Sequence, residues 1–246
     1  MTESVKEKPI VWTISGSDCS GGAGIAADIK TGHALGVEVC HLITANTVQN
    51  ANRLVSINPV ASETLQQQAK VLIDDKPPSV IKIGLIANLE QVTWLTELLA
   101  GFKADYPKIS VVFDPVGQAS VGGRFSTLER EDLTLLFSYI DVITPNLMEA
   151  QQLSNLLILN PVELAIKIAE LGVASVIVKG GHSAVLDNDG LQVSDDYCLH
   201  HVEQSSISYQ LSSPRINTSY SHGGGCSFAS ALAAFLAHGY LLRDAF

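Results

Sequence analysis

Short β-rich runs alternate along this chain with longer amphipathic stretches, and this alternation limits the folds that the chain can adopt. The runs are almost continuously apolar, as expected of strands that are buried on both faces of a sheet. Strands that alternate with helices predict a mostly parallel sheet covered by helices on both faces. The apolar runs are IVWTISG, CHLITAN, SVIKIGLI, ISVVFDPV, DVITPN and SVIVKGG, and the clearest helical stretches are AADIKTGHALG and LEQVTWLTELLAGF.

The composition is typical of one soluble α/β domain. The 246 residues are 46% hydrophobic, enough for one sizeable core, and no repeat or linker divides them. No apolar run approaches the roughly 18 residues of a membrane span. The four cysteines lie far apart with no CxxC pair, which indicates reduced thiols. The formal net charge of −10 repels nucleic acid, anionic membranes and free nucleotides. We therefore expect a cytoplasmic protein, with no nucleic-acid or membrane partner, that binds any phosphate through short-range contacts.

Polar residues and glycines follow the predicted strands at the points where the strands end. The carboxyl ends of parallel strands meet at one edge of a sheet, which is where ligands bind in open α/β folds. We therefore expect these residues to converge on one site. They are Gly16, Asp18, Asn46, Gln49, Asp114, Asn146, Glu149, Lys179, Gly180 and Gly181.

Two familiar nucleotide-binding motifs are only partly present. The segment GAGIAA (22–27) fits the dinucleotide pattern, but the second predicted strand ends in ITANT, without an acidic residue for a ribose hydroxyl. The segment GIAADIKT has an isoleucine in place of the second P-loop glycine and has the pattern of a helix interior. Neither a dinucleotide site nor a P-loop is expected.

The loop SHGGGC (221–226) leads directly into an alanine-rich helical stretch. Backbone N–H groups at a helix start form an anion site, and glycines let a ligand approach that backbone closely. The positive electrostatic potential at a helix start also lowers the pKa of a thiol, so Cys226 is expected to be partly thiolate. Two plainer interpretations stay open: Cys226 as a small buried residue, and His222 as an ordinary loop histidine.

Three acidic positions also have two interpretations each. Asp28 reaches the site from the first turns of a helix, or it is exposed while Asp18 or Ser20 caps that helix. Asp114 is a magnesium ligand, or it forms a turn with the proline that follows. Glu149 faces an anion or ion together with Asn146, or the two form a capping box, and both roles are compatible.

Four segments in this order resemble the hydroxymethylpyrimidine and phosphomethylpyrimidine kinases of thiamine biosynthesis, in the ribokinase-like superfamily. The segments are SGSDCSGGAGIAADIK, TPNLMEA, VKGGH and HGGGCSFASALAA. The resemblance covers nearly the whole chain. It implies a three-layer αβα sandwich and phosphoryl transfer from ATP with Mg²⁺, first to 4-amino-5-hydroxymethyl-2-methylpyrimidine and then to its monophosphate.

The resemblance also implies a role for each site residue. For the substrate, Asp28 and Gln49 correspond to polar contacts with the pyrimidine, Leu85 and Val116 to apolar walls, and Gly16 to part of the pocket. For ATP and Mg²⁺, Asp114 and Glu149 correspond to the metal site, Asn146 and Glu149 to the phosphate site, and Lys179 to the lysine near the phosphates. Gly223, Gly224, Gly225 and Cys226 correspond to the catalytic loop. A homodimer is implied as well.

Three features depart from the family pattern. Gly224 stands where the family usually has threonine, and the stretch GQASVGG after Asp114 lacks the usual lysine. The sequence ends at Phe246, where relatives continue through further helix, so residues 1–246 are expected to form one kinase domain without that helical end. Two rival functions stay open. One is a pyridoxal kinase of the same fold, and the other is a non-catalytic ligand-binding paralogue.

Overall fold

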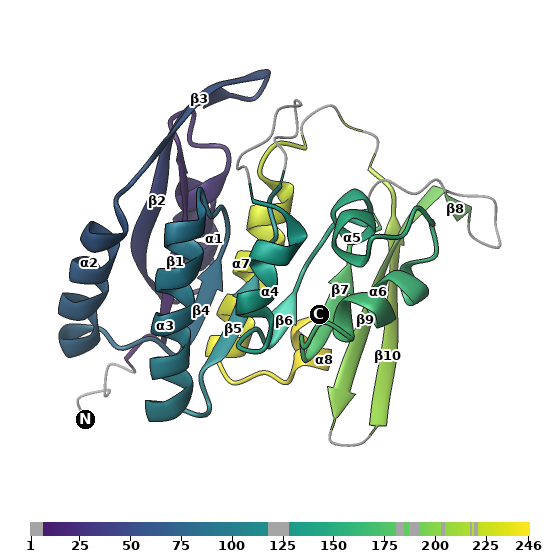
Figure 1. Ribbon diagram of the computed structural model, residues 1–246. Coiled ribbons are helices and arrows are strands. Elements are labelled where there is room, and N and C mark those ends of the chain that lie inside the picture. The colour runs from purple at the N-terminus through teal and green to yellow at the C-terminus, as the bar shows by residue number, and fades with distance from the viewer. Residues whose placement is uncertain are drawn as a thin grey trace, which may run out of the picture.

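One sheet runs through the protein (Figure 1). The computed structural model describes residues 7–117, 128–180, 185–186, 192–202, 205–216, 218 and 221–246. Within them the strand order is β10–β9–β7–β6–β5–β4–β1–β2–β3, and β8 pairs with β9. The six central strands are parallel, and antiparallel strands flank them at both edges. The strands are β1 (Ile10–Asp18), β2 (Glu38–Asn50), β3 (Arg53–Pro59), β4 (Val80–Ile83), β5 (Ser110–Phe113), β6 (Val142–Ile143), β7 (Ser175–Val178), β8 (Val185–Leu186), β9 (Gln192–Val202) and β10 (Ser205–Pro214).

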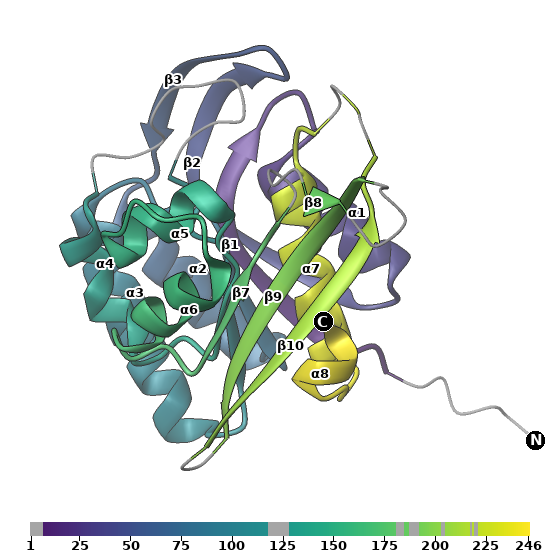
Figure 2. The same ribbon diagram turned by 90° about the vertical axis from the view of Figure 1, so that its right-hand side faces the viewer.

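Helices cover both faces of this sheet, as Figure 2 shows, which confirms the predicted three-layer fold. Helices α2 to α6 lie on one face, and α1, α7 and α8 lie on the other. Each face has its own core because successive strand residues point to opposite sides. Val11 packs with α7 and α8, for example, whereas Trp12 packs with α3. The helices are α1 (Gly24–Ala34), α2 (Ser62–Asp75), α3 (Leu89–Asp105), α4 (Arg130–Phe137), α5 (Leu147–Ser154), α6 (Pro161–Ala169), α7 (Gly224–Ala237) and α8 (Leu242–Ala245).

Two antiparallel hairpins extend the parallel sheet. One is β9–β10, whose strands pair regularly from Val193–Pro214 to Val202–Ser205 although many of their residues are polar. The other hairpin, β2–β3, rises beyond the sheet because β2 continues past Asn46 to Asn50 (Figure 1). Gln49 therefore lies within a strand rather than after one.

A lysine and an aspartate form an ion pair inside the protein. The Lys82 ammonium lies 3.0 Å from both carboxylate oxygens of Asp28, and both side chains are almost fully buried. The hydroxyls of Thr13 and Ser230 donate to the same carboxylate, at 2.5 and 2.7 Å. Burial lowers the pKa of Lys82, but the charge of Asp28, its hydrogen bond to Lys82 and further nearby acidic groups, including Asp114, together outweigh burial, so the net shift is upward. This cluster joins β1, β4, α1 and α7 directly beneath the carboxyl edge of the sheet.

We predict that Lys82→Met lowers the free energy of unfolding by about 3–5 kcal/mol, because it leaves the Asp28 carboxylate buried without a counter-charge. Urea denaturation measures this change. The double variant Lys82→Met with Asp28→Asn removes both charges. It keeps one carbonyl oxygen that accepts from one hydroxyl and adds an amide N–H that can donate to the other hydroxyl oxygen, so it should recover at least half of the loss. A double variant no more stable than the single one would contradict this account of the cluster.

Candidate active site

A cavity of about 490 Å³ opens at the carboxyl edge of the sheet. Its walls come from the loop after β1, the hairpin β2–β3, the ends of β4 to β7, strand β9 and the start of α7. Residues far apart in the sequence therefore meet here, as the strand-end argument predicted. The predicted site residues on its wall are Gly16, Gln49, Leu85, Asp114, Val116, Asn146, Glu149, Lys179, Gly223, Gly224, Gly225 and Cys226.

One end of the cavity holds a lysine between two carboxylates. The Lys179 ammonium lies 2.9 Å from Oδ1 of Asp114. Burial lowers the pKa of Lys179, but Asp114 and Glu149 together raise it by more, so the net shift is upward. Burial raises the pKa of Glu149 to about 7; Lys179 opposes this shift and Asp114 adds to it. Oδ2 of Asp114 is buried and has no hydrogen-bond partner within the described residues. This end combines a fixed cation with carboxylate oxygens that can still bind a ligand.

Glu149 also caps the helix on which it lies. The Glu149 carboxylate accepts from the Asn146 N–H at 2.8 Å, and the Asn146 side chain accepts from the Glu149 N–H at 2.9 Å. The capping box predicted as one interpretation is therefore present, and it places Glu149 on the cavity wall as well. The two interpretations are compatible here.

The other end of the cavity is more apolar and is closed by Gln49. A register shift between Val48 and Gln49 interrupts the β2–β3 pairing beside it. The Gln49 side chain is buried, and its Oε1 has no partner among the described residues. Leu85 and Val116 provide apolar wall, and Leu85 packs so closely on Gly16 that a Cβ there would lie 2.5 Å from Leu85 Cδ2. A ring that donates a hydrogen bond fits this end.

The start of α7 lies beside Lys179 and Asp114 on the cavity wall. Gly223 has a φ of 81°, and a Cβ on it would lie 1.9 Å from the Gly22 carbonyl oxygen, so this position needs glycine. A Cβ on Gly225 would lie 3.1 Å from the Lys179 ammonium, whereas one on Gly224 would meet nothing within 4 Å. The first N–H groups of a helix have no partner in that helix. Those of Gly225 and Cys226 therefore lie beside Lys179 without a partner in α7.

The family described as phosphomethylpyrimidine kinase matches residues 18–246 of this chain. The chain belongs to this family. The hydroxymethylpyrimidine/phosphomethylpyrimidine kinase of Haemophilus influenzae is 37% identical over 242 residues, covering 96% of this chain and 86% of the relative. The enzyme of the same name from Bacillus subtilis is 35% identical over 241 residues, covering 95% and 83%. This chain is therefore a kinase, as the resemblance implied.

Solved structures confirm the ribokinase-like fold of this kinase. An ADP complex of Bacillus subtilis pyridoxal kinase is similar with a TM-score of 0.78 and 29% identity, covering 97% of this chain and 87% of that one. The phosphomethylpyrimidine kinase of Clostridium difficile has a TM-score of 0.73 and 28% identity, covering 97% and 94%. Fold similarity alone therefore does not distinguish a pyridoxal kinase from a phosphomethylpyrimidine kinase.

Asp28 does not lie on the wall of the kinase cavity, in contrast to the expectation from the resemblance. Its side chain points into the protein, where Lys82, Thr13 and Ser230 bind the carboxylate. The other interpretation, an exposed Asp28, is also wrong, because the residue is only 2% exposed. The contact with Lys82 on β4 turns this face of α1 away from the cavity. Asp28 thus supports the site from beneath.

Cys226 lines the cavity of this kinase but is not a thiolate. Burial raises the pKa of its thiol to about 11; Lys82 and the Gly24 N–H oppose the shift, and Asp114 and Asp28 add to it. The expected thiolate is therefore wrong for the free protein, because the loss of hydration outweighs the field of the helix start. A neutral thiol is a weak base at pH 7. It can still contact and orient a hydroxyl group.

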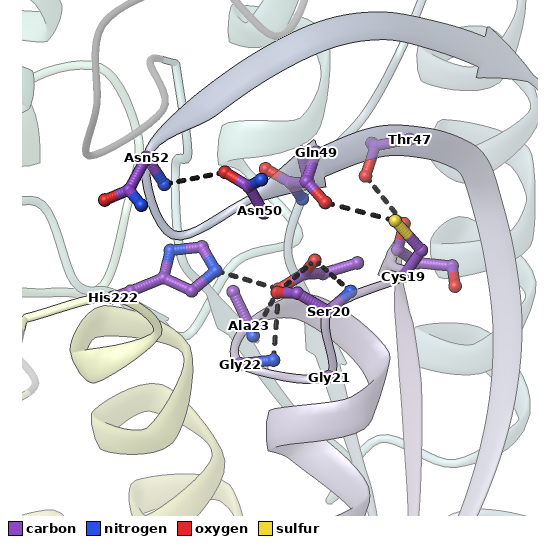
Figure 3. A network of polar contacts seen from close by, with 12 residues as sticks. Cys19, Ser20, Gly21, Gly22, Ala23, Thr47, Gln49, Asn50, Asn52 and His222 are labelled. Atoms are coloured by element: carbon purple, nitrogen blue, oxygen red, sulfur yellow. Dashed lines mark hydrogen bonds and ion pairs between the residues drawn. The ribbon is translucent and has the colours of Figure 1, made fainter.

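Sequence reasoning missed several features of the kinase site. Lys82 was overlooked, although a lone lysine in the apolar run SVIKIGLI is a usable signal for a buried ion pair. Asp18 accepts from the N–H groups of Ser20, Gly22 and Ala23, and also bonds His222 (Figure 3). Further residues on the cavity wall are Ser15, Ala23, Gly24, Thr47, Met148, Gln152, Ser194, Asp196, Ser221, His222 and Phe228.

Some predictions about this kinase fall outside the described structure. Gly181, His182 and most of GQASVGG lie beyond the described residues. Within the described part of the chain, no helix has the length and hydrophobicity to span a membrane. The cytoplasmic location and the homodimer stay predictions.

We predict that iodoacetamide modifies Cys226 slowly at neutral pH, because only the thiolate reacts and burial keeps the thiol protonated. The rate should rise about tenfold per pH unit between pH 6 and 9.5 without levelling off, given a pKa of about 11. Peptide mass spectrometry at each pH measures the rate. Exposed Cys19 and fully buried Cys198 serve as internal controls for accessibility. A rate for Cys226 that levels off below pH 9 would show that the helix start dominates after all.

Proposed function

We propose that this kinase transfers the γ-phosphoryl group of ATP to the hydroxyl of 4-amino-5-hydroxymethyl-2-methylpyrimidine and then to the resulting monophosphate, as part of thiamine biosynthesis. The observation that carries the proposal is the polarity of the cavity. Gln49, Leu85 and Val116 lie on the part of the wall next to the β2–β3 hairpin, whereas Asp114, Glu149 and Lys179 form a charged cluster. The start of α7 lies beside that charged cluster. The names of the curated relatives support the choice of pyrimidine.

Mg²⁺ fits the carboxylate end of the cavity. The ion prefers oxygen ligands and keeps several waters, so it needs only one or two protein carboxylates together with substrate phosphates. The unpartnered Oδ2 of Asp114 and the buried Glu149 carboxylate meet that need. Within the described residues no group of three or more His, Cys, Asp or Glu side chains forms a metal cage. When bound, Mg²⁺ would neutralise charge that develops on the phosphates.

The chain's own residues bind the phosphates, the transferred group and the acceptor. Lys179 binds phosphate oxygens, and Asp114 holds its ammonium in place at 2.9 Å. The N–H groups of Gly225 and Cys226 stabilise the transferred group, and a single donor of this kind typically contributes about 10²- to 10³-fold in rate. Gln49 binds the ring, and the neutral thiol of Cys226 orients the acceptor hydroxyl. Because the net charge of the protein is −10, these local contacts supply all of the attraction for ATP.

A pyridoxal kinase is the second candidate, since the pyridoxal kinases of Bacillus subtilis and Staphylococcus aureus share the fold with TM-scores of 0.78. Release of ADP, measured by a coupled assay with each acceptor, separates the two functions. The pyrimidine alcohol should have the higher kcat/KM, because Gln49 Oε1 requires a donor such as the amino group of the pyrimidine. A higher kcat/KM for pyridoxal would favour the pyridoxal kinase. No ADP release with either acceptor, despite binding of the pyrimidine, would favour a non-catalytic paralogue.

We predict that Lys179→Met or Glu149→Gln weakens transition-state stabilisation by about 2–4 kcal/mol, because each removes one well-placed charge. Pyrimidine affinity, measured by calorimetry, should barely change, and ATP binding should require Mg²⁺. Lys103→Met is a matched control, since Lys103 pairs with Asp141 at the amino end of β6. That variant should keep its turnover within about twofold. Normal turnover of Lys179→Met would remove Lys179 from the proposed mechanism.

Two neighbouring glycines should differ sharply on substitution. We predict that Gly225→Ala lowers kcat at least tenfold, because its methyl group would lie 3.1 Å from the Lys179 ammonium and displace it. Gly224→Ala, with nothing within 4 Å of the added methyl, should stay within about threefold of the original kcat. Steady-state kinetics of the two variants provides the comparison. Equal losses at both positions would mean that Lys179 and Gly225 are not coupled.

A further inference from the structure

A histidine and an aspartate connect the two glycine loops of the site. Nε2 of His222, in the loop before α7, lies 2.8 Å from Oδ2 of Asp18, at the end of β1. The two residues are separated by 204 positions in the sequence. Figure 3 shows the His222 ring beside the turn that contains Gly22 and Ala23. The Asp18 side chain is fully buried, and the His222 side chain is 17% exposed.

Asp18 also fixes the turn on its own side of this contact. Its carboxylate accepts from the N–H groups of Ser20, Gly22 and Ala23 at 2.8 to 3.1 Å, and from the Ser20 hydroxyl. Burial raises the pKa of Asp18, but the bonds from His222, Ser20 and Ala23 outweigh it, so the net shift is downward. The carboxylate is therefore ionised at neutral pH and is held by several donors at once.

The two loops also fit together sterically. The His222 ring lies against the backbone of Gly22, where a Cβ would be 2.5 Å from the ring carbon Cδ2. Gly223 packs on the Gly22 carbonyl oxygen so closely that a Cβ would lie 1.9 Å from it. The loop before α7 and the turn before α1 are therefore in close contact at both Gly22 and Gly223. The N–H groups of Gly225 and Cys226 follow directly after that contact.

We propose that His222 and Asp18 form a latch that positions the start of α7 for phosphoryl transfer. This inference rests on the proposed kinase function. His222 is a positioning residue, because its Nε2 contacts Asp18 and not a reacting group. The latch sets the direction of the N–H groups that stabilise the transferred phosphoryl group. Misplacement of such groups by about 1 Å can cost on the order of 100-fold in rate.

Kinetics tests the latch with a graded pair of variants. His222→Ala should lower kcat 10- to 100-fold and change the KM for the acceptor less than threefold, because the hydrogen bond of the His222 ring goes to Asp18 and not to Gln49. His222→Gln, whose amide nitrogen can reach the Nε2 position, should recover most of that loss. A glutamine variant as slow as the alanine variant would overturn the proposal in favour of proton transfer by the imidazole, which glutamine cannot perform.

A double-variant comparison of kcat with Asp18→Ala provides the second test. If the two residues act as one unit, the double variant with His222→Ala should be no slower than the slower single variant. Losses that multiply would overturn the latch. His238→Ala is the matched control, since Nε2 of His238 bridges α7 to the Leu35 carbonyl oxygen at the other end of α1, also at 2.8 Å. It should leave kcat within about twofold of the original.

Backbone hydrogen exchange tests the latch without any substrate. In His222→Ala, the hydrogen-bonded amides of Gly224 and Ser227 should exchange at least about tenfold faster than in the unmodified protein, because the loop opens more often. His222→Gln and His238→Ala should leave that exchange close to the original. Unchanged exchange in His222→Ala overturns the latch even in an active kinase. Faster exchange in a protein that phosphorylates neither acceptor would keep the latch and refute the proposed function.

Discussion

The contact between the Lys82 ammonium and the Asp28 carboxylate is the interaction on which the site depends. Two charges buried in the protein are tolerated only when they are paired and hydrogen-bonded, and here the Thr13 and Ser230 hydroxyls complete the set. Because its members lie on β1, β4, α1 and α7, the cluster fixes two helices against the sheet. The starts of both helices therefore meet at the carboxyl edge, where Gly24 and Gly225 line the same cavity.

The groups on the cavity wall explain how an acidic protein can bind a polyanion. The field of the whole protein opposes ATP, since the net charge is −10. Inside the cavity the balance differs locally, because Lys179 and two helix starts supply positive potential within a few ångströms. Lys179 is already engaged by Asp114 and lies near Glu149, so in the proposed mechanism a phosphate complexed with Mg²⁺ is a better ligand for these carboxylates than free phosphate.

Burial also changes the chemistry of Cys226. A helix start stabilises a thiolate, but only where water or a cation compensates for the loss of hydration. Cys226 lies inside the protein near two carboxylates, and Lys82 is already engaged by Asp28. The thiol thus stays protonated, and its contribution is one of shape and hydrogen bonding. Close packing also decides the backbone nearby, because Gly223 fits against the Gly22 carbonyl oxygen only without a side chain.

The sequence by itself determined the layers, the active edge and most of the cavity wall. Apolar runs and the residues after them fix these features, because strand direction places every carboxyl end on one side. The tertiary structure alone decided the direction of Asp28, the protonation of Cys226 and the meeting of Asp18 with His222. Each depends on a partner distant in the sequence: Lys82 is 54 positions from Asp28, and His222 is 204 positions from Asp18. A local pattern can indicate that Lys82 is buried, but it does not say which residue pairs with it, since burial and charge at one position are set by whatever packs against it.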